Sequence, residues 1–519
     1  MKNFITSAIF ALLLSGCSIS NKIKIDRDAT AIKYAATITA EELKDHLSIL
    51  ASDAYEGRET GMPGQKKAAA YIENYYKRIH VPGGMKDGTY KQEFPLIVEN
   101  PKNIDVSILK YAEGEADKPQ KIELQYLKDY YYFGGFNDTT LRDVEMVFVG
   151  YGIDEQSFNS YKTDVKGKAV IILEGAPNFL ADKGITKDWD NWRLKLKTAQ
   201  EKGAVAAFTI KKEFNESIEM IRYFVENPRM QLHNKGQKKY DRIPNCYFPD
   251  SLIETLLSKS ISELQTLGLN EESINTTLRV NMKSYFIDSS MKAENILGFI
   301  EGTDLKEEIV VLSAHYDHIG FDNGEICNGA DDDGSGTVAV LEIAQAFMKA
   351  KQEGNGPRRS ILFLNVSGEE KGLLGSQYYT ENPIYPLKNT ITDLNVDMIG
   401  RIDENHENDQ YVYLIGADRI STDLHLISEA CNNEYAKLEL DYTYNKKSDP
   451  NRFYYRSDHY NFAKNNIPVI FYFSGVHEDY HKPTDDVEKI MFPKMVQISR
   501  LIFHTAWELA NRSQKPAID

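Results

Sequence analysis

The alternation of apolar runs with amphipathic segments predicts an α/β protein. In the second half of the chain, short apolar runs of strand length are separated by longer segments whose apolar residues recur at helical spacing. These runs cover residues 308–314, 359–367, 394–400 and 467–475. Strands that are buried on both faces read as continuous apolar runs, so the pattern predicts a mostly parallel central sheet flanked by helices.

The first half of the chain is less regular. A capping-box pattern that opens at Thr39 predicts one helix, and apolar residues at helical spacing predict a second helix over 64–80. Further on, strand-like runs at 143–153, 165–175 and 205–210 predict a smaller, β-rich inserted domain. The expected division is a signal peptide (1–16), a tether (17–38), the first part of the main domain (39–135), the inserted domain (136–275) and the rest of the main domain (276–519).

The N-terminus predicts export and a lipid anchor. An apolar run from Phe4 to Leu14 follows Lys2; it is too short to span a bilayer but has the length of a signal-peptide core. The run ends in Leu-Ser-Gly-Cys, which resembles the bacterial lipobox. This resemblance implies cleavage before Cys17 and lipid attachment to its sulfur, on the periplasmic or the outer face of the bacterial cell envelope. The alternative is an ordinary buried cysteine at the end of a hydrophobic helix.

Composition narrows the possible functions only a little. The 519 residues carry a formal net charge of −16, which argues against a nucleic-acid partner because such a partner requires a basic face. Beyond Cys17, the cysteines at 246, 327 and 431 fit no zinc-site spacing. Cysteine therefore does not carry the chemistry.

Histidine and carboxylate side chains follow the ends of the predicted strands in the second half. Ligands of open α/β sheets bind beyond the carboxyl ends of the strands, so these side chains are expected to converge. Zinc accepts imidazole nitrogen and carboxylate oxygen, and two zinc ions would share a bridging carboxylate. The candidates are His315 and Asp317 after the first run, Glu369 and Glu370 after the second, Asp397 near the end of the third, His481 after the fourth, and Asp332 in a turn before a helix.

Five sequence blocks resemble those of the M28 peptidases, in the same order and at similar spacing. They are AHYDHIG (314–320), NGADDDGSG (328–336), SGEEKGLLGS (367–376), NVDMIGR (395–401) and DYHKPTDD (479–486). The resemblance also covers 47–72 and 294–302, and the middle of the chain is similar to the protease-associated (PA) domain that is often inserted in this family. It implies a zinc-dependent exopeptidase acting on peptides, with an aminopeptidase as the leading expectation.

The resemblance implies a role for each candidate residue. His315 and Asp397 would be terminal ligands of one Zn²⁺, Glu370 and His481 terminal ligands of the other, and Asp332 the bridge between them. Asp317 would orient His315, Glu369 would be the general base, and Tyr480 would donate a hydrogen bond to the oxyanion. The choice of Asp332 over its two aspartate neighbours rests on the family pattern, because nothing in the sequence separates the three.

Several alternatives stay open from the sequence. His318, in the loop after the first run, is expected to be solvated or to lie outside the ligand set, and His477 and His459 are expected not to be ligands. Carboxypeptidase or dipeptidase activity fits the same fold. So does glutaminyl cyclase activity, which would use a single zinc, and so does a non-catalytic binding protein. Side-chain preference and oligomeric state are not defined by the sequence.

Overall fold

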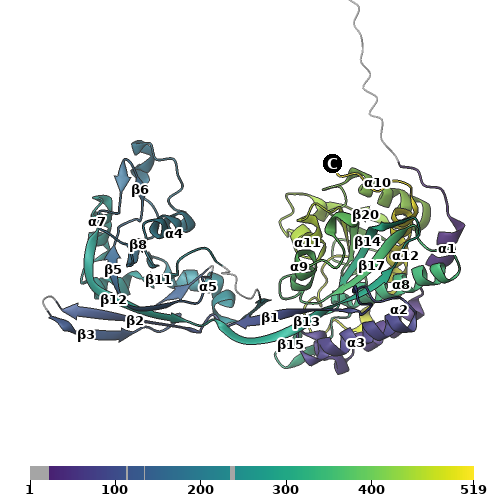
Figure 1. The fold of residues 1–519 in the computed structure, drawn as a ribbon, viewed down its shortest axis with the longest axis horizontal. Coiled ribbons are helices and arrows are strands. Elements are labelled where there is room, and N and C mark those ends of the chain that lie inside the picture. Colours follow the sequence, from purple (N-terminus) through teal and green to yellow (C-terminus); the bar gives the residue numbers. More distant parts are fainter. Residues whose placement is uncertain (1–22, 113–114, 134, 234–239) are drawn as a thin grey trace, which may run out of the picture. The chain divides into compact units, whose positions relative to one another are not determined.

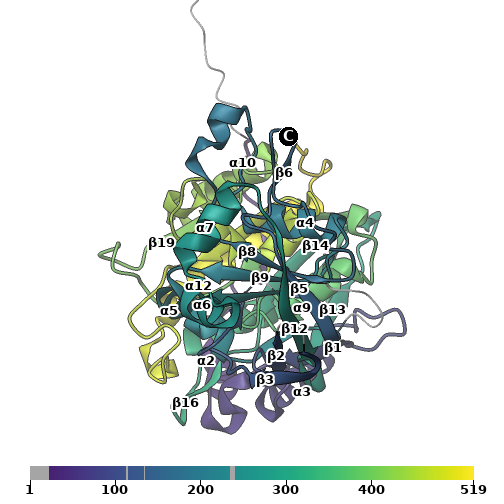
Figure 2. The same cartoon turned by 90° about the vertical axis from the view of Figure 1, so that its left-hand side faces the viewer.

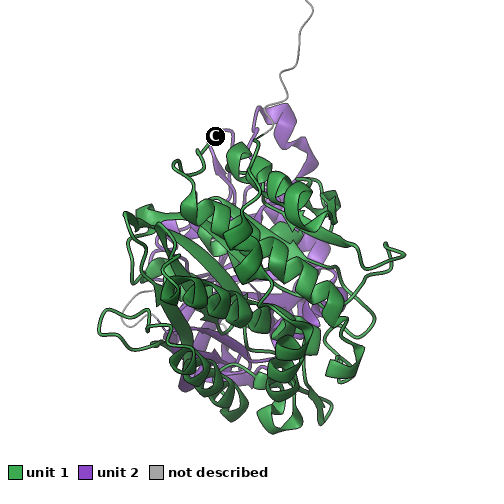
Figure 3. Cartoon of the chain, turned by 90° about the vertical axis from the view of Figure 1, so that its right-hand side faces the viewer, with its two compact units in different colours: residues 1–94, 293–519 green, residues 95–292 purple. Residues whose placement is uncertain are grey.

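The structure is a computed structural model that describes residues 23–112, 115–133, 135–233 and 240–519. The chain divides into two compact units. Unit 1 comprises residues 1–94 and 293–519, and unit 2 comprises residues 95–292 (Figure 1; Figure 3). Strands β1 (Lys91–Glu99) and β13 (Ile287–Ile300) carry the chain from one unit to the other. The predicted signal peptide and Cys17 lie outside the described residues.

Unit 1 is built on a mixed β-sheet. Its strands follow the order β1-β13-β17-β14-β18-β21-β19-β20. The central strands β17, β14, β18 and β21 are parallel, whereas β13 runs antiparallel to β17 and β19 runs antiparallel to β21. The predicted α/β class is confirmed, and the four apolar runs form the parallel centre of the sheet. The bounds are β14 Leu305–His315, β15 Gly320–Asp322, β16 Glu325–Cys327, β17 Arg359–Val366, β18 Thr390–Val396, β19 Tyr411–Ile415, β20 Glu439–Asp441 and β21 Val469–Phe473.

Helices cover both faces of this sheet, as Figure 3 shows from one side. Helices α1 (Ala29–Ala35), α2 (Ala40–Leu50), α3 (Pro63–Arg78), α8 (Gly336–Gln352), α10 (Thr422–Cys431) and α12 (Phe492–Asn511) share one apolar core with the strands. Helices α9 (Leu374–Glu381) and α11 (His459–Ala463) pack on the other face. The N-cap predicted at Thr39 is confirmed, because its side chain accepts a hydrogen bond from the amide of Glu42. Among the described residues, no helix is both long and apolar enough to cross a membrane.

Unit 2 contains an eight-stranded sheet in the order β3-β2-β12-β5-β8-β9-β11-β4 (Figure 2). Strands β5, β8, β9 and β11 are parallel. Helix α4 packs on one face, and α6 and α7 pack on the other. The bounds are β2 Ile104–Ala112, β3 Glu115–Glu123, β4 Tyr131–Tyr132, β5 Thr140–Phe148, β6 Asp154–Glu155, β7 Phe158–Asn159, β8 Ala169–Leu173, α4 Trp192–Glu201, β9 Ala206–Lys211, α5 Phe214–Glu226, β10 Arg229–Leu232, β11 Asn245–Pro249, α6 Asp250–Leu257, α7 Ile261–Leu269 and β12 Ile274–Ser284.

Unit 2 is larger than the inserted domain expected at 136–275. Strand β12 pairs antiparallel with both β2 and β5, so strands from both flanks of the expected insertion join its sheet. The compact unit therefore begins at residue 95 and ends at residue 292. The strand-like pattern before residue 136, which the sequence assigned to the main domain, belongs to this second sheet.

Candidate metal centre

Parallel strands bring the candidate residues to one edge of the sheet in unit 1. His315 is the last residue of β14, and Asp397 directly follows β18. Glu369 and Glu370 lie just beyond the end of β17, and His481 lies on the loop that follows β21. Because these four strands are parallel, their carboxyl ends meet at the same edge, where α/β proteins bind their ligands.

The three consecutive aspartates before α8 have different partners. Asp331 accepts a hydrogen bond from the amide of Gly400 at 2.6 Å, and Asp333 accepts one from the amide of Met398 at 3.1 Å. These two carboxylates therefore hold the loop after β18. The Oδ2 atom of Asp331 also lies 3.3 Å from the imidazole of His477. The carboxylate of Asp332 instead lies between the imidazoles of His315 and His481, as the family pattern implied.

The carboxylate of Asp332 lies between two sets of donor atoms. Its Oδ1 is 3.4 Å from His315 Nε2, which is itself 3.6 Å from Asp397 Oδ1. Its Oδ2 is 3.1 Å from His481 Nε2, which is itself 3.1 Å from Glu370 Oε2. The structure thus brings together all five predicted ligands, with Asp332 in the middle.

The donor atoms of this cluster are placed to bind a metal ion, and some of them make no hydrogen bond to one another. Asp332 Oδ2 and His481 Nε2 are buried and have no hydrogen-bond partner within the described part of the chain. Two groups lie close enough to hold a metal ion, one made by His315, Glu369 and Asp397 and one by His318, Asp332 and Glu370. Buried polar atoms normally have partners, so converging donors without them indicate a ligand. Imidazole nitrogen and carboxylate oxygen are donors that zinc accepts.

The predicted orienting residue, Asp317, contacts both sides of the site. The Nδ1 atom of His315 is 3.2 Å from the backbone carbonyl of Asp317 and 3.8 Å from its Oδ1. The carboxylate of Asp317 also accepts a hydrogen bond from Thr60 at 2.6 Å and one from the amide of Glu369 at 3.3 Å. The imidazole of His315 is therefore oriented mainly through a carbonyl, and the Asp317 carboxylate fixes the backbone of Glu369.

Glu369 differs from Glu370 in its surroundings. Glu370 contacts two imidazoles, with Oε1 3.0 Å from His318 Nδ1 and Oε2 3.1 Å from His481 Nε2. Glu369 lies on the other side, beside His315 and Asp397. Burial raises the pKa of the Glu369 carboxyl well above its usual range; His315 opposes this shift, and the charge of Glu370 adds to it.

A small cavity of about 30 Å³ opens beside the first donor group. Its walls are formed by the donor residues and by apolar side chains, with Arg456 and Tyr480 at the same opening. The apolar lining is Met398, Phe453, Phe471, Phe473 and Val476. The ring of Tyr480 stacks on the ring of His481 with the centroids 3.9 Å apart, and burial raises the pKa of Tyr480. The phenol is therefore protonated at neutral pH and available as a donor.

Two further residues support the site. His318, expected either to be solvated or to contact the ligands from outside their set, is fully buried and contacts Glu370. Arg58, on the loop before α3, is also buried and donates hydrogen bonds to the carbonyls of Leu50, Tyr316, Asn328 and Gly329. His318 occurs within the motif that contains His315, and this was the available signal. Arg58 lies within the N-terminal stretch of the resemblance, where no role was assigned to it.

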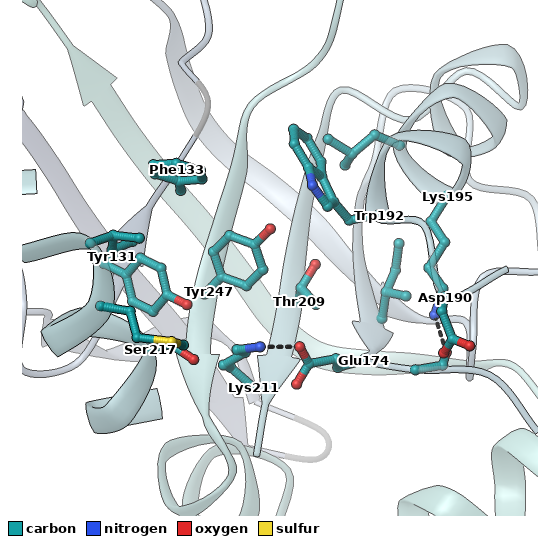
Figure 4. A pocket seen from close by; sticks show the side chains of 15 residues that line it. Tyr131, Phe133, Glu174, Asp190, Trp192, Lys195, Thr209, Lys211, Ser217 and Tyr247 are labelled. Atoms are coloured by element: carbon teal, nitrogen blue, oxygen red, sulfur yellow. Dashed lines mark hydrogen bonds and ion pairs between the residues drawn. The ribbon is translucent and has the colours of Figure 1, made fainter. Parts of the chain in front are cut away.

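Unit 2 has a pocket of a different kind, called here the aromatic pocket (Figure 4). Its volume is about 220 Å³, and it lies over strands β8, β9 and β11, beside α4 and α5. The aromatic walls are Tyr131, Phe133, Trp192 and Tyr247, and the charged side chains are Glu174, Asp190, Lys195 and Lys211. No histidine or cysteine lines it, so it offers none of the imidazole donors found in unit 1.

Comparisons with known proteins agree with the resemblance for the C-terminal part of unit 1. Residues 295–506 match the family described as Peptidase family M28, so this segment is similar to the family that the sequence blocks resemble. A "Probable leucine aminopeptidase" from Arthroderma otae is 32% identical over 235 residues, which is 44% of this chain and 61% of the relative. A "Probable glutamate carboxypeptidase LAMP1" from Arabidopsis thaliana is 38% identical over 107 residues, which is 20% of this chain and 15% of the relative.

A solved structure is similar over most of the chain. The aminopeptidase from Aneurinibacillus sp. strain AM-1 aligns with 94% of this chain and 98% of its own, at 18% identity and a TM-score of 0.49. The curated relatives match only part of this chain, and the chain spans 61% of the length of the Arthroderma otae protein. By the family match over residues 295–506 alone, the segment of unit 1 that carries the donor cluster is M28 peptidase-like.

Proposed function

We propose, from the premise that residues 295–506 are M28 peptidase-like, that this chain is a zinc-dependent aminopeptidase that removes N-terminal residues from peptides. One observation carries the proposal. The Asp332 carboxylate lies between two imidazole-containing donor sets, with Glu369 beside the first. The relatives named leucine aminopeptidase support the direction of cleavage.

The donors divide into two zinc positions. His315 and Asp397 would hold one Zn²⁺, Glu370 and His481 the other, and Asp332 would bridge them. When bound, zinc polarises the scissile carbonyl and lowers the pKa of a water molecule. Five apolar side chains line part of the cavity beside His315, and they are suited to contact an apolar side chain of the peptide.

Glu369 is the proposed general base. Its backbone amide is held by Asp317, and its carboxyl lies beside His315 and Asp397. A carboxyl whose pKa is raised by burial takes a proton from the attacking water and can return it to the amine that leaves. Tyr480, protonated at neutral pH, donates a hydrogen bond to the oxyanion that forms at the scissile carbonyl.

A second candidate function is favoured by Arg456. This exposed guanidinium stacks over Phe453 at 4.8 Å and shares the cavity with Tyr480, 3.5 Å from its hydroxyl. Arginine binds carboxylates well, so it can select a peptide with a free C-terminus. Carboxypeptidase or dipeptidase activity is therefore the alternative, and the relative named glutamate carboxypeptidase supports it.

A substrate panel tests these functions together. The full chain is assayed with leucine p-nitroanilide, its N-acetylated form, a C-terminally amidated dipeptide, the free dipeptide and a peptide with N-terminal glutamine, each with and without chelator. Chelator-sensitive release from the free amine alone supports an aminopeptidase. Dependence on a free C-terminus supports the alternative, and cyclisation of glutamine with one zinc per chain would replace both. No turnover of any substrate by zinc-loaded protein would contradict an enzyme.

We also propose that the chain is exported and anchored through lipid on Cys17, on the basis of the lipobox-like sequence. Metabolic labelling with an alkyne fatty acid in a bacterial host tests this. The wild-type chain should incorporate label, and the C17S variant should not. We propose, from its sequence, that unit 2 is PA-like and limits the size of the substrate. Deletion of residues 95–292 should then change the peptide-length preference, and an unchanged preference would contradict this role.

A further inference from the structure

His318 is the buried imidazole of the donor cluster that neither the family pattern nor the proposed mechanism uses. It lies on the turn after β14 and is 0% exposed. Its Nδ1 atom is 3.0 Å from Glu370 Oε1 and 3.7 Å from Asp332 Oδ2. The side chain therefore points at two of the residues proposed to hold the second zinc.

The ring of His318 is held in this orientation from several sides. Its backbone amide donates to the carbonyl of Arg58 at 3.3 Å. Gly329 packs against the ring so closely that a Cβ at that position would lie 2.5 Å from the Cγ of His318. The ring of His481 meets it edge-on with the centroids 5.7 Å apart. An imidazole fixed in this way is preorganised toward Glu370 and Asp332.

A hydrogen bond of the other ring nitrogen, Nε2, does not explain why the His318 side chain is buried. His318 Nε2 is buried and has no hydrogen-bond partner among the residues that the structure describes. A structural histidine in a protein interior normally uses both nitrogens. Among the described residues, the polar contacts of this ring are thus those of Nδ1, on the side of the donor cluster.

The spacing of the donors matches that of a tetrahedral zinc site. Zinc–nitrogen and zinc–oxygen bonds of about 2.0–2.1 Å place neighbouring donors roughly 3.4 Å apart in a tetrahedron. His318 Nδ1 is 3.0 and 3.7 Å from oxygens of Glu370 and Asp332. His481 Nε2 is 3.1 Å from an oxygen of each of the same two residues. Both imidazoles are placed alike with respect to the carboxylates.

We propose that His318 Nδ1 is a further ligand of the second metal, together with Asp332, Glu370 and His481. This inference rests on the proposed zinc-dependent function. It makes the two metal positions unequal. The first position, formed by His315, Asp332 and Asp397, has three protein donors, of which one is an imidazole. The second position, which includes His318, has four protein donors, of which two are imidazoles. Four protein donors are typical of tightly held zinc, and three are typical of zinc that acts in catalysis.

The inequality predicts a difference in metal preference. Imidazole-rich sites favour zinc, whereas carboxylate-rich sites also accept manganese. The position with two imidazoles should therefore fill first and retain zinc selectively. The position with one imidazole should exchange its metal more readily.

Metal binding by the full chain tests the proposal without reference to activity. Metal-free wild type, H318A and H318N are titrated with Zn²⁺ against a chromophoric chelator, and with Co²⁺ while the visible absorption is recorded. The control variant is H46A, which removes a buried imidazole of unit 1 that pairs with Glu342 at 3.3 Å. Far-UV circular dichroism establishes that each variant is folded, and H318N serves if H318A does not fold.

The wild type should bind two ions with unequal affinities, and H46A should do the same. H318A or H318N should lose more than about 100-fold in affinity at the tighter position, more than is typical when a residue that merely orients a ligand is lost. The intense Co²⁺ absorption of a four-coordinate site should also weaken. A smaller loss with an unchanged Co²⁺ spectrum would show that His318 only orients Glu370 and would overturn the ligand assignment. Absence of metal binding by the wild type would instead contradict the proposed function.

Discussion

The donor cluster of unit 1 and the aromatic pocket of unit 2 both contain charged side chains, but they satisfy those charges differently. In the aromatic pocket, Lys195 donates to the carbonyls of Leu173 and Gly175, and Lys211 pairs with Glu174 (Figure 4). In the donor cluster, carboxylates and imidazoles face one another, and buried atoms such as Asp332 Oδ2 have no hydrogen-bond partner among the described residues.

The polar groups of the aromatic pocket are satisfied by the protein itself, whereas those of the donor cluster need a ligand to satisfy them. Lys195 and Lys211 find their partners within the protein, so neither side chain needs a ligand. Converging donors with perturbed pKa values are typical of functional sites. The aromatic pocket is the larger hollow, with about 220 Å³ against about 30 Å³, yet the smaller one contains the chemistry.

The largest expected effect is the loss of turnover when the base is removed. E369Q keeps the shape of the side chain but cannot take a proton, so kcat should fall roughly 100- to 10,000-fold. Zinc content should remain at the wild-type level, because Glu370 and the other proposed ligands are unchanged. Steady-state kinetics and metal analysis of the same sample check both statements. Near-normal kcat in E369Q would show that Glu369 is not the base.

Removal of metal should affect unit 1 alone. A ligand that binds only the folded state stabilises it by about 4 kcal/mol at a thousand times its dissociation constant. Chelation should therefore lower the thermal transition of unit 1 and leave that of unit 2 in place. Differential scanning calorimetry of the full chain, with and without zinc, measures this. An equal shift of both transitions would contradict the view that zinc binds in unit 1 and not in unit 2.

Loss of the Arg58 guanidinium should destabilise unit 1 next most strongly. R58A leaves buried carbonyls of Leu50, Tyr316, Asn328 and Gly329 without donors, and it should cost about 3 kcal/mol in the free energy of unfolding. R58K should recover part of this, because an ammonium reaches fewer carbonyls than a guanidinium. Urea unfolding of both variants provides the measurement. Equal stability of R58A and wild type would exclude this anchoring role.

Lys195 provides a pH-dependent test of unit 2. Burial lowers its pKa to about 8, and the nearby Asp190 and Glu174 oppose this shift only in part. Above pH 8 the folded state releases the proton while the unfolded state, with a pKa near 10.5, keeps it, so the free energy of unfolding rises with pH. Relative to K195M, wild type should gain about 1 kcal/mol between pH 7 and pH 9. A stability difference that does not change with pH would mean that Lys195 titrates normally.

The smallest effect on stability is expected from the ion pair between Lys211 and Glu174, which line the aromatic pocket. K211Q removes the ion pair with Glu174, in which both side chains are partly exposed. Such pairs contribute between zero and about 1 kcal/mol, so unfolding should change little. Peptidase activity should not change at all, because Lys211 lies in unit 2 and no step uses it. A large loss of activity in K211Q would assign unit 2 a direct part in turnover.

The parallel centre of the fold and the proposed ligand set could be predicted because they depend on local sequence. Apolar runs identify buried strands, and polar residues directly after them identify the edge of the sheet. His315, Glu370, Asp397 and His481 were accessible as candidates to this reasoning. The family pattern then divided them between two metal positions.

Features that depend on contacts between distant segments could not be predicted in this way. Asp331 contacts the amide of Gly400 and the imidazole of His477, whereas Asp332 contacts His315 and His481, and nothing in the run of three aspartates reveals this difference. The sequence places His318 in a loop and does not show that Gly329, which is distant in the sequence, packs against its ring and buries it. The limits of unit 2 depend on the pairing of β12 with β2, which joins segments on both sides of the insertion.

The position of Arg58 has a consequence for how the chain is made. This residue precedes unit 2 in the sequence, yet its hydrogen-bond acceptors at Tyr316, Asn328 and Gly329 follow unit 2. Unit 2 is continuous and can fold as soon as residue 292 has emerged, because domains fold as units during synthesis. The donor cluster must wait for His481. A chain that is still being synthesised or exported therefore contains no assembled site, and a fragment trimmed to residues 295–506 would lack the arginine that holds two of its loops together.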